Sequence, residues 1–258
     1  MSVLEIAGER FRFQIDGAQD APPLVLAHSL GTTLEMFDPV VPALARRFRV
    51  VRYDARGHGQ STAHDAVYAM GDLGRDLLNI LDRLSLGPVH LCGLSLGGMV
   101  GQWMALHAPQ RLRRLVLANT TAYAGPPRVW EGRIKAVRHH GTAPIADAVI
   151  DSWFTPEFRA RQPEAVAKVR AMVVATSASG YTGTSCGMRD MDFRPDLPRI
   201  TTPTLVIVSD ADRATPPAWG EAVAAAIPSA QLVRLPGGHM SPIEQPEGFA
   251  AAVTGFLG

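Results

Sequence analysis

A serine between two glycines is the residue of this chain best suited to act as a nucleophile. The sequence Gly93-Leu94-Ser95-Leu96-Gly97 is a G-x-S-x-G motif; the short apolar run 88–92 precedes it and the helix-like run 97–106 follows it. Strand, sharp turn and helix in that order are the context of a nucleophile elbow. Glycines permit the turn, and the unpaired amides at the helix start favour negative charge. The pattern predicts a nucleophilic Ser95, and the alternative is a structural turn with an incidental serine.

A serine nucleophile needs a base, and the base needs an orienting group. The chain has eight histidines, of which His239 follows the apolar run 231–235 in the loop Gly237-Gly238-His239. A loop after the last strand of an alternating strand–helix chain can bring a histidine to the serine. We therefore expect His239 to be the base, the alternative being a solvated loop histidine.

Two aspartates follow the apolar run 204–208 and compete for the role of the orienting acid. Asp212 lies further past the strand end and precedes Thr215-Pro216-Pro217, which is typical of a helix start with proline in its first turn. Asp210 is closer to the strand and could instead bond the amides of its own turn. We favour Asp212, which gives the chain order serine, aspartate, histidine.

Attack by a serine on a carbonyl also requires amides that stabilise the oxyanion. One comes from the residue after the nucleophile, Leu96, and the other from the loop after an early strand. The run 24–27 is that strand, and by position Leu30 supplies the second amide. This loop begins His28-Ser29, where many hydrolases have His-Gly, and we interpret His28 as bracing the loop rather than as a second base. Each donor is commonly worth on the order of 3 kcal/mol of barrier.

Composition favours one soluble enzyme domain. The chain has 258 residues, 47% of them hydrophobic and 19% charged, and its formal net charge is +1. This chain length suits one large core, and without a basic stripe nucleic acid is not an expected partner. Two cysteines are too few for a disulfide framework and indicate a reducing compartment. Because the N-terminus is charged and no run is long enough to span a bilayer, we expect a cytoplasmic protein without membrane association.

Short apolar strands alternate with amphipathic helices along most of the chain. This alternation predicts an α/β fold with a mostly parallel sheet that helices cover on both faces. The expected strands are 11–15, 24–27, 50–53, 88–92, 115–118, 204–208 and 231–235, and the clearest helices are 72–84, 97–106 and 246–257.

The stretch from Thr120 to Pro198 breaks this rhythm, because it contains no clear strand. Prolines bound its helical segments, at positions 126, 127, 144, 156 and 163. A structureless loop of this length is implausible in a compact domain. We predict a helical cap, 120–198, inserted into an α/β core made of 1–119 and 199–258. Such a cap would lie over Ser95, exclude water and shape the pocket; a helical insertion packed elsewhere is the alternative.

Several motifs together resemble a known family. They are His28-Ser29-Leu30-Gly31-Thr32, Arg52-Tyr53-Asp54-Ala55-Arg56-Gly57-His58-Gly59, the elbow extended to Trp103, and Asp212-Arg213-Ala214-Thr215-Pro216-Pro217. On these residues the chain resembles the α/β-hydrolase family over its whole length. Within that family it is most similar to the 3-oxoadipate enol-lactonases of bacterial aromatic degradation, the β-ketoadipate pathway. The triad motifs are shared by many hydrolases, whereas the cap segments around Trp130 and Arg189 are more discriminating.

The resemblance implies a serine hydrolase that opens 3-oxoadipate enol-lactone to 3-oxoadipate through an acyl-enzyme, with no metal or organic cofactor. The substrate's remote carboxylate requires a cation, and arginine suits bidentate carboxylate binding. Arg133 and Arg189 are the candidates in the cap, and Trp130 and Trp153 are candidate pocket residues.

Two alternatives remain open. One is a broad-specificity carboxylesterase or perhydrolase on the same fold, with a different cap pocket. The other is a hydrolase-fold ligand-binding or signalling protein, for which a damaged triad is the usual mark. In this chain all three triad residue types are present.

Overall fold

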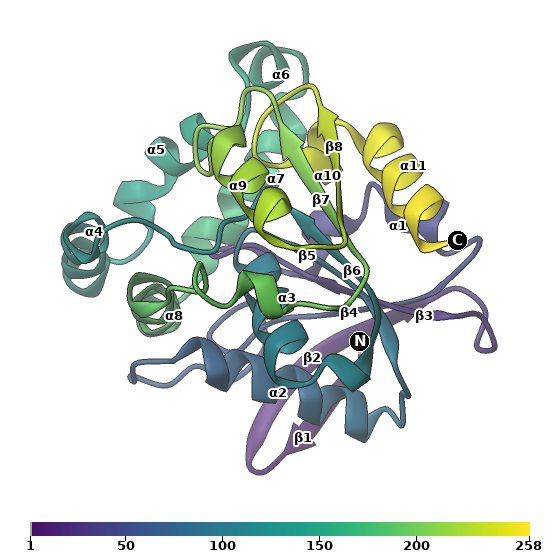
Figure 1. Cartoon of the computed structure of the whole chain (residues 1–258). Coiled ribbons are helices and arrows are strands. Elements are labelled where there is room, and N and C mark those ends of the chain that lie inside the picture. Colours follow the sequence, from purple (N-terminus) through teal and green to yellow (C-terminus); the bar gives the residue numbers. More distant parts are fainter. Residues whose placement is uncertain (1) are drawn as a thin grey trace.

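The computed structural model describes residues 2–258, in which eight strands form one sheet of order β1-β2-β4-β3-β5-β6-β7-β8 (Figure 1). The expected mostly parallel sheet is confirmed, since the six strands from β4 to β8 in this order run parallel and only the β1–β2 and β2–β4 pairs are antiparallel. The strands are β1 Ser2–Ile6, β2 Glu9–Asp16, β3 Pro23–Ala27, β4 Arg49–Tyr53, β5 Val89–Leu94, β6 Leu112–Ala118, β7 Thr204–Ser209 and β8 Ala230–Leu235.

Helices fill the connections between the strands. The α-helices are α1 Val41–Leu44, α2 Met70–Arg83, α3 Leu96–His107, α4 Pro127–His140, α5 Ala143–Trp153, α6 Pro156–Arg161, α7 Pro163–Ala175, α8 Ala178–Asp190, α9 Pro217–Ala226, α10 Ser241–Glu244 and α11 Pro246–Leu257. Short 3₁₀ helices are η1 Leu34–Phe37, η2 Pro109–Arg111 and η3 Leu197–Arg199.

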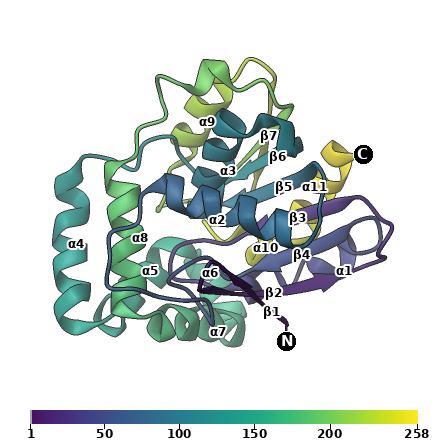
Figure 2. The same ribbon diagram turned by 90° about the horizontal axis from the view of Figure 1, so that it is seen from below.

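Both faces of the central strands are buried, and the period-2 alternation of strand side chains divides the core into two layers. In β6, Leu115 and Leu117 point into the layer covered by α2, α3 and α9, while Val116 and Ala118 point into the layer covered by α1 and α11. Figures 1 and 2 show α2 and α3 adjacent on one face of the sheet. The two layers hold the strand ends rigidly, so loops at those ends can position side chains.

The segment between β6 and β7 contains helices α4 to α8 and, within the described residues, no strand beyond an isolated bridge between Tyr123 and Asp192. Its prolines stand in the first turns of α4, α5, α6 and α7. Proline suits these positions because its fixed φ matches the helix and its missing N–H would be unpaired there anyway. Figure 2 shows α4 and α8 running side by side at one end of the molecule.

An edge strand and the start of one helix illustrate where the structure differs from the sequence-based expectation. The edge strand β1 was not expected, and it pairs antiparallel with β2 while most of its side chains stay exposed. Helix α2 begins at Met70 instead of 72, because Asp72 occupies the third helical position and its Oδ2 accepts a bond from the Ala69 amide at 2.8 Å. Among the described helices, none combines the length and apolar character that crossing a bilayer requires.

Candidate active site

The turn between β5 and α3 holds Ser95 in a strained backbone conformation. Its φ is 56° and its ψ is −113°, a region that non-glycine residues seldom occupy and that clusters at functional sites. Two bonds hold it there: the Ser95 amide donates to Ala118 O at 2.9 Å, and Thr120 Oγ1 donates to Ser95 O at 2.7 Å. The chain therefore turns sharply at this residue, as an elbow requires.

The glycines of the motif are required by close backbone contacts. A Cβ atom on Gly93 would lie 2.1 Å from Gly97 O, and one on Gly97 would lie 2.0 Å from Ala27 O. Both distances are too short for any side chain. Strand β5, helix α3 and strand β3 can thus approach one another only with glycine at these two positions, and this approach brings the loop after β3 to the start of α3.

His239 and Asp212 meet at the ends of β8 and β7. The Nδ1–H of His239 donates to Asp212 Oδ2 at 2.9 Å, and both residues are buried. This bond places the proton on Nδ1 and leaves Nε2 of His239 free to accept one. The Trp153 ring stacks on the imidazole, with centroids 5.9 Å apart and planes inclined by 27°.

Asp212 accepts hydrogen bonds from several groups besides His239. Its Oδ1 accepts from the Ala214 and Thr215 amides, both at 2.8 Å, and its Oδ2 accepts from Thr215 Oγ1 at 2.8 Å and Asn119 Nδ2 at 3.0 Å. Burial by itself raises the pKa of Asp212, but the facing His239 and the bonds from His239 and Thr215 together hold this pKa below its usual value. The carboxylate is therefore kept ionised and fixed in direction.

The competing aspartate points elsewhere. Asp210 lies on the surface, where its Oδ1 accepts two bonds from Arg234 at 2.9 and 3.0 Å. The structure thus brings Asp212, and not Asp210, to His239.

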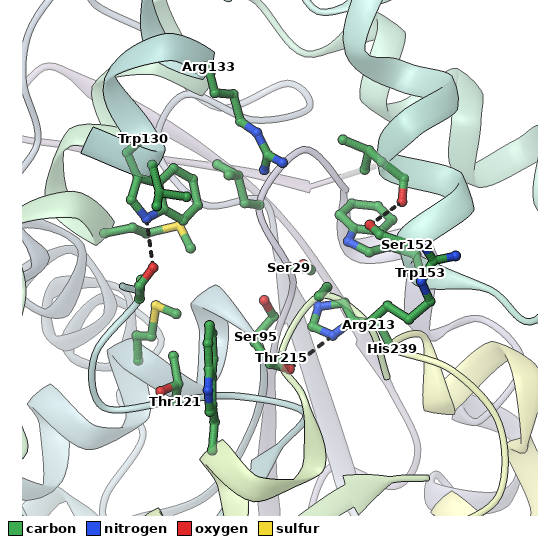
Figure 3. Close-up of a pocket in the computed structure, with 18 of the residues that line it drawn as sticks. Ser29, Ser95, Thr121, Trp130, Arg133, Ser152, Trp153, Arg213, Thr215 and His239 are labelled. Carbon is green, nitrogen blue, oxygen red and sulfur yellow. Dashed lines mark hydrogen bonds between the residues drawn. The ribbon is translucent and has the colours of Figure 1, made fainter. Parts of the chain in front are cut away.

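Ser95 and His239 line one cavity of about 210 Å³ (Figure 3). In the described part of the chain, Ser95 Oγ makes no hydrogen bond to His239; such contacts often tighten only when a substrate is bound. The lining residues are Ser29, Leu30, Ser95, Met99, Thr121, Ala124, Val129, Trp130, Arg133, Val149, Ser152, Trp153, Tyr181, Met188, Arg213, Ala214, Thr215, Trp219 and His239.

The two amides expected to stabilise an oxyanion lie in the loop after β3 and at the start of α3. Within residues 2–258, neither the Leu30 amide nor the Leu96 amide has a hydrogen-bond acceptor. Ser29 O accepts bonds from His28 Nδ1 at 2.8 Å, Thr32 Oγ1 at 2.8 Å and the Thr32 amide at 3.2 Å. Because C=O and N–H point in opposite directions across a trans peptide, these bonds fix the direction of the Leu30 N–H.

Two buried histidines connect this loop to the loop after β4. The Ala55 amide donates to His28 Nε2 and the Gly31 amide donates to His58 Nε2, each at 2.9 Å. A backbone amide can only donate, so both rings are neutral and carry their proton on Nδ1. Burial lowers the pKa of His28 to about 4, and burial together with the nearby His28 lowers the pKa of His58 to about 3. Asp54 adds a third connection, accepting from the Leu34 amide at 2.9 Å.

The residues predicted to bind substrate divide into two groups. Trp130, Trp153 and Arg133 line the cavity. Arg133 lies over the Trp130 ring, 5.4 Å from its centroid, and forms no salt bridge in the described part of the chain. Arg189 does not line the cavity and instead forms a bidentate pair with its neighbour Asp190, at 2.6 and 2.7 Å. The structure thus brings Arg133, and not Arg189, to Ser95.

Several lining residues were not identified from the sequence. Arg213 follows Asp212 directly and brings a second guanidinium to the cavity, where its Nη1 is 3.5 Å from Asp151 O. Its position next to the predicted acid could have indicated it. Ser29 and Tyr181 carried no comparable signal, since only the fold brings α8 over the loop after β3.

Comparisons with known proteins agree with this geometry. The family model for the alpha/beta hydrolase fold matches residues 22–246, and the chain therefore belongs to the α/β-hydrolase family. The chain is 37% identical to 3-oxoadipate enol-lactonase 2 of Acinetobacter baylyi over 93% of its own length and 90% of that protein.

Two solved structures are also similar over nearly the whole chain. One is the enol-lactonase from Burkholderia xenovorans, with 39% identity, a TM-score of 0.97 and coverage of 99% of both chains. The other is a hydrolase from Pseudomonas aeruginosa, with 46% identity, a TM-score of 0.97 and coverage of 100% of this chain and 98% of that one.

Proposed function

We propose that this protein is a lactone hydrolase that converts 3-oxoadipate enol-lactone to 3-oxoadipate, with Ser95, His239 and Asp212 as its catalytic triad. The observation that carries the proposal is one cavity lined by Ser95, by His239, which is bonded to Asp212, and by Arg133, which has no acidic partner among residues 2–258. The identity to enol-lactonases over most of the chain supports it.

In the proposed mechanism, Ser95 Oγ attacks the ring carbonyl while His239 Nε2 takes its proton. The carbonyl oxygen becomes an oxyanion that the Leu30 and Leu96 amides stabilise. The ring C–O bond then breaks and leaves an enolate, which is resonance-stabilised and needs little acid assistance. This enolate takes up the proton that His239 received from Ser95 and becomes a ketone, which leaves His239 neutral again while the acyl group remains on Ser95. A water molecule then gives a proton to the neutral His239 and attacks the acyl carbon. His239 passes this proton to Ser95 Oγ as the acyl C–O bond breaks, which releases 3-oxoadipate and restores the serine.

Arg133 is the group we propose for the substrate's remote carboxylate. Guanidinium and carboxylate form two parallel hydrogen bonds, which fix orientation as well as charge. Arg133 lies over Trp130, interacts with Tyr181 and forms no salt bridge within residues 2–258, so we propose that its charge is available to a ligand. Trp130 and Trp153 would supply the apolar walls around the lactone ring.

We also propose the division into an α/β core, 1–119 and 199–258, and a helical cap, 120–198. Arg133 of α4, Trp153 of α5 and Tyr181 of α8 line the cavity opposite Ser95 and His239, which supports this role for the segment. The cysteines Cys92 and Cys186 are buried free thiols, which supports a reducing, cytoplasmic setting. A small molecule is the only class of partner that we propose.

The experiment is a comparison of specificity constants for three substrates: the enol-lactone, its neutral methyl ester and p-nitrophenyl acetate. We expect kcat/KM to be highest for the acidic lactone by at least tenfold. Equal values for the lactone and its methyl ester would favour the broad carboxylesterase. No turnover of any substrate, with ligand binding retained, would favour the binding protein.

A further inference from the structure

The Ser29 hydroxyl is buried in the cavity wall without a hydrogen-bond partner. Six side-chain groups in the described part of the chain are buried in this way, and Ser29 is the only one of them that lines the cavity. Buried polar groups are nearly always paired, so an unpaired one needs an explanation. Figure 3 shows Ser29 facing the space that Ser95, His239 and Arg133 also face.

The backbone around this hydroxyl is fully engaged, in contrast to its side chain. Ser29 O accepts three bonds, from His28 Nδ1, Thr32 Oγ1 and the Thr32 amide, and the Ser29 amide lies 3.4 Å from Met36 Sδ. The residue is therefore held in place. Its hydroxyl proton has no acceptor among residues 2–258 and can rotate toward a ligand without breaking an existing bond.

We propose that Ser29 Oγ is a third donor to the oxyanion, beside the Leu30 and Leu96 amides. The Ser29 C=O and the Leu30 N–H belong to one peptide unit. The bonds to Ser29 O therefore fix the orientation of Ser29 as well as the direction of the Leu30 N–H. The other charged part of the proposed substrate, its carboxylate, is the part that we assign to Arg133. The acyl oxygen is then the acceptor that we assign to this hydroxyl, because a donor fixed before the reaction stabilises the negative charge as it develops.

This inference deepens the proposed function and rests on its serine mechanism, but not on the identity of the lactone. A glycine at this position offers no such donor. The chain with Ser29→Gly is consequently the natural comparison with hydrolases that have His-Gly here.

The test is steady-state kinetics of Ser29→Ala and Ser29→Gly on both the enol-lactone and p-nitrophenyl acetate. Because the donor acts on the transition state, we expect kcat to fall roughly 10- to 100-fold on both substrates while KM changes less than twofold. Ser29→Thr, which keeps a hydroxyl, should recover most of kcat. Thr184→Val is the matched control, since the Thr184 hydroxyl is also buried and unpaired but lies outside the cavity.

A second readout is the affinity of phenylboronic acid, whose adduct with the serine carries a tetrahedral oxyanion, measured by calorimetry against that of adipate. Ser29→Ala should weaken the boronate by about the same factor as kcat and leave adipate unchanged. The proposal is overturned if kcat is unchanged, if only KM rises, or if Thr184→Val loses as much kcat. Should the wild-type protein hydrolyse the aryl ester but not the enol-lactone, the proposed substrate fails while the Ser29 test still gives its answer.

Discussion

Three histidines with the same burial lie in two chemically different regions of the molecule, and of these only His239 lines the cavity. His28, His58 and His239 are each 1% exposed. His239 faces the Asp212 carboxylate, whereas the Nε2 atoms of His28 and His58 accept bonds from the Ala55 and Gly31 amides. The partner of each ring, and not its burial, determines whether it can take a proton during a reaction.

The region of His239 and Asp212 can hold a positive charge, whereas the region of His28 and His58 keeps both rings neutral. A proton on His239 Nε2 would make an imidazolium that Asp212 stabilises. A proton on Nε2 of His28 or His58 would point at a backbone N–H and break the bond that holds the oxyanion loop. The low pKa values of these two rings, about 4 and about 3, keep them neutral near pH 7. In the proposed mechanism, His239 therefore moves protons, whereas His28 and His58 hold backbone amides in place.

The largest expected loss of kcat comes from a change in the region of His239 and Asp212. Asp212→Asn should lower kcat about 10⁴-fold, because an asparagine favours the wrong tautomer of His239. Asp210→Asn is the control and should change kcat less than threefold, since Asp210 pairs with Arg234 on the surface. Steady-state rates of the two purified variants test whether Asp212 orients His239. Equal losses would mean that Asp212 is not the orienting acid.

In the region of His28 and His58, we expect a substitution that keeps a hydrogen-bond acceptor to preserve kcat. His58→Leu leaves the Gly31 amide buried without an acceptor and should lower kcat roughly 10- to 100-fold, because the Leu30 amide is then misplaced. His58→Gln keeps an oxygen near the position of Nε2 and should retain most of kcat. Circular dichroism and thermal denaturation check that both variants fold. If the glutamine variant is as slow as the leucine variant, His58 acts as more than an acceptor.

Arg133 and Arg189 allow the same kind of comparison for recognition of the substrate's negative charge. Arg133→Gln should lower kcat/KM for the acidic lactone about 10-fold, or ~1–2 kcal/mol, a modest value because Arg133 is partly in solvent. Its effect on p-nitrophenyl acetate should be within twofold. Arg189→Gln should leave both values unchanged, since Arg189 pairs with Asp190 away from the cavity. A loss in Arg189→Gln without a loss in Arg133→Gln would reverse the assignment.

The smallest effect concerns stability against pH. The native pKa values of His28 and His58 lie below the value of about 6.5 for an unfolded histidine, so the unfolded chain binds more protons below pH 6.5. Stability from these neutral rings is present above pH 6.5 and falls as the pH drops toward 4. Urea denaturation from pH 7 to pH 4 should show this loss, and His58→Gln should show a shallower one. An identical slope in the variant would exclude His58 from the linkage.

Sequence reasoning selected Ser95, Asp212 and His239, which the structure does bring together, while their catalytic roles stay a prediction. Ser95 follows a buried strand, and His239 and Asp212 follow the two last parallel strands, whose carboxyl ends meet at one edge of the sheet. The choice of Asp212 over Asp210 also follows from this spacing, because a residue two positions further along the chain lies beyond the end of the strand and can turn toward His239.

Contacts between distant segments were beyond such reasoning. The motif around Arg56-Gly57-His58 was visible in the sequence, but its function was not, since its partner is the Gly31 amide, 27 residues earlier in the chain. Arg133 and Arg189 were equivalent candidates until α4 and α8 were packed together. Helical periodicity does not say which arginine faces a cavity.

The central claim is an acyl group on Ser95, and mass spectrometry tests it most directly. The wild-type protein is mixed with excess 3-oxoadipate enol-lactone, quenched in acid within milliseconds, and analysed as intact protein and as peptides. The account predicts an adduct of the ring-opened acyl group on the peptide that contains Ser95, and no adduct in Ser95→Ala, which should also lose turnover while staying folded. Full turnover by Ser95→Ala, or an adduct on any other residue, would contradict it.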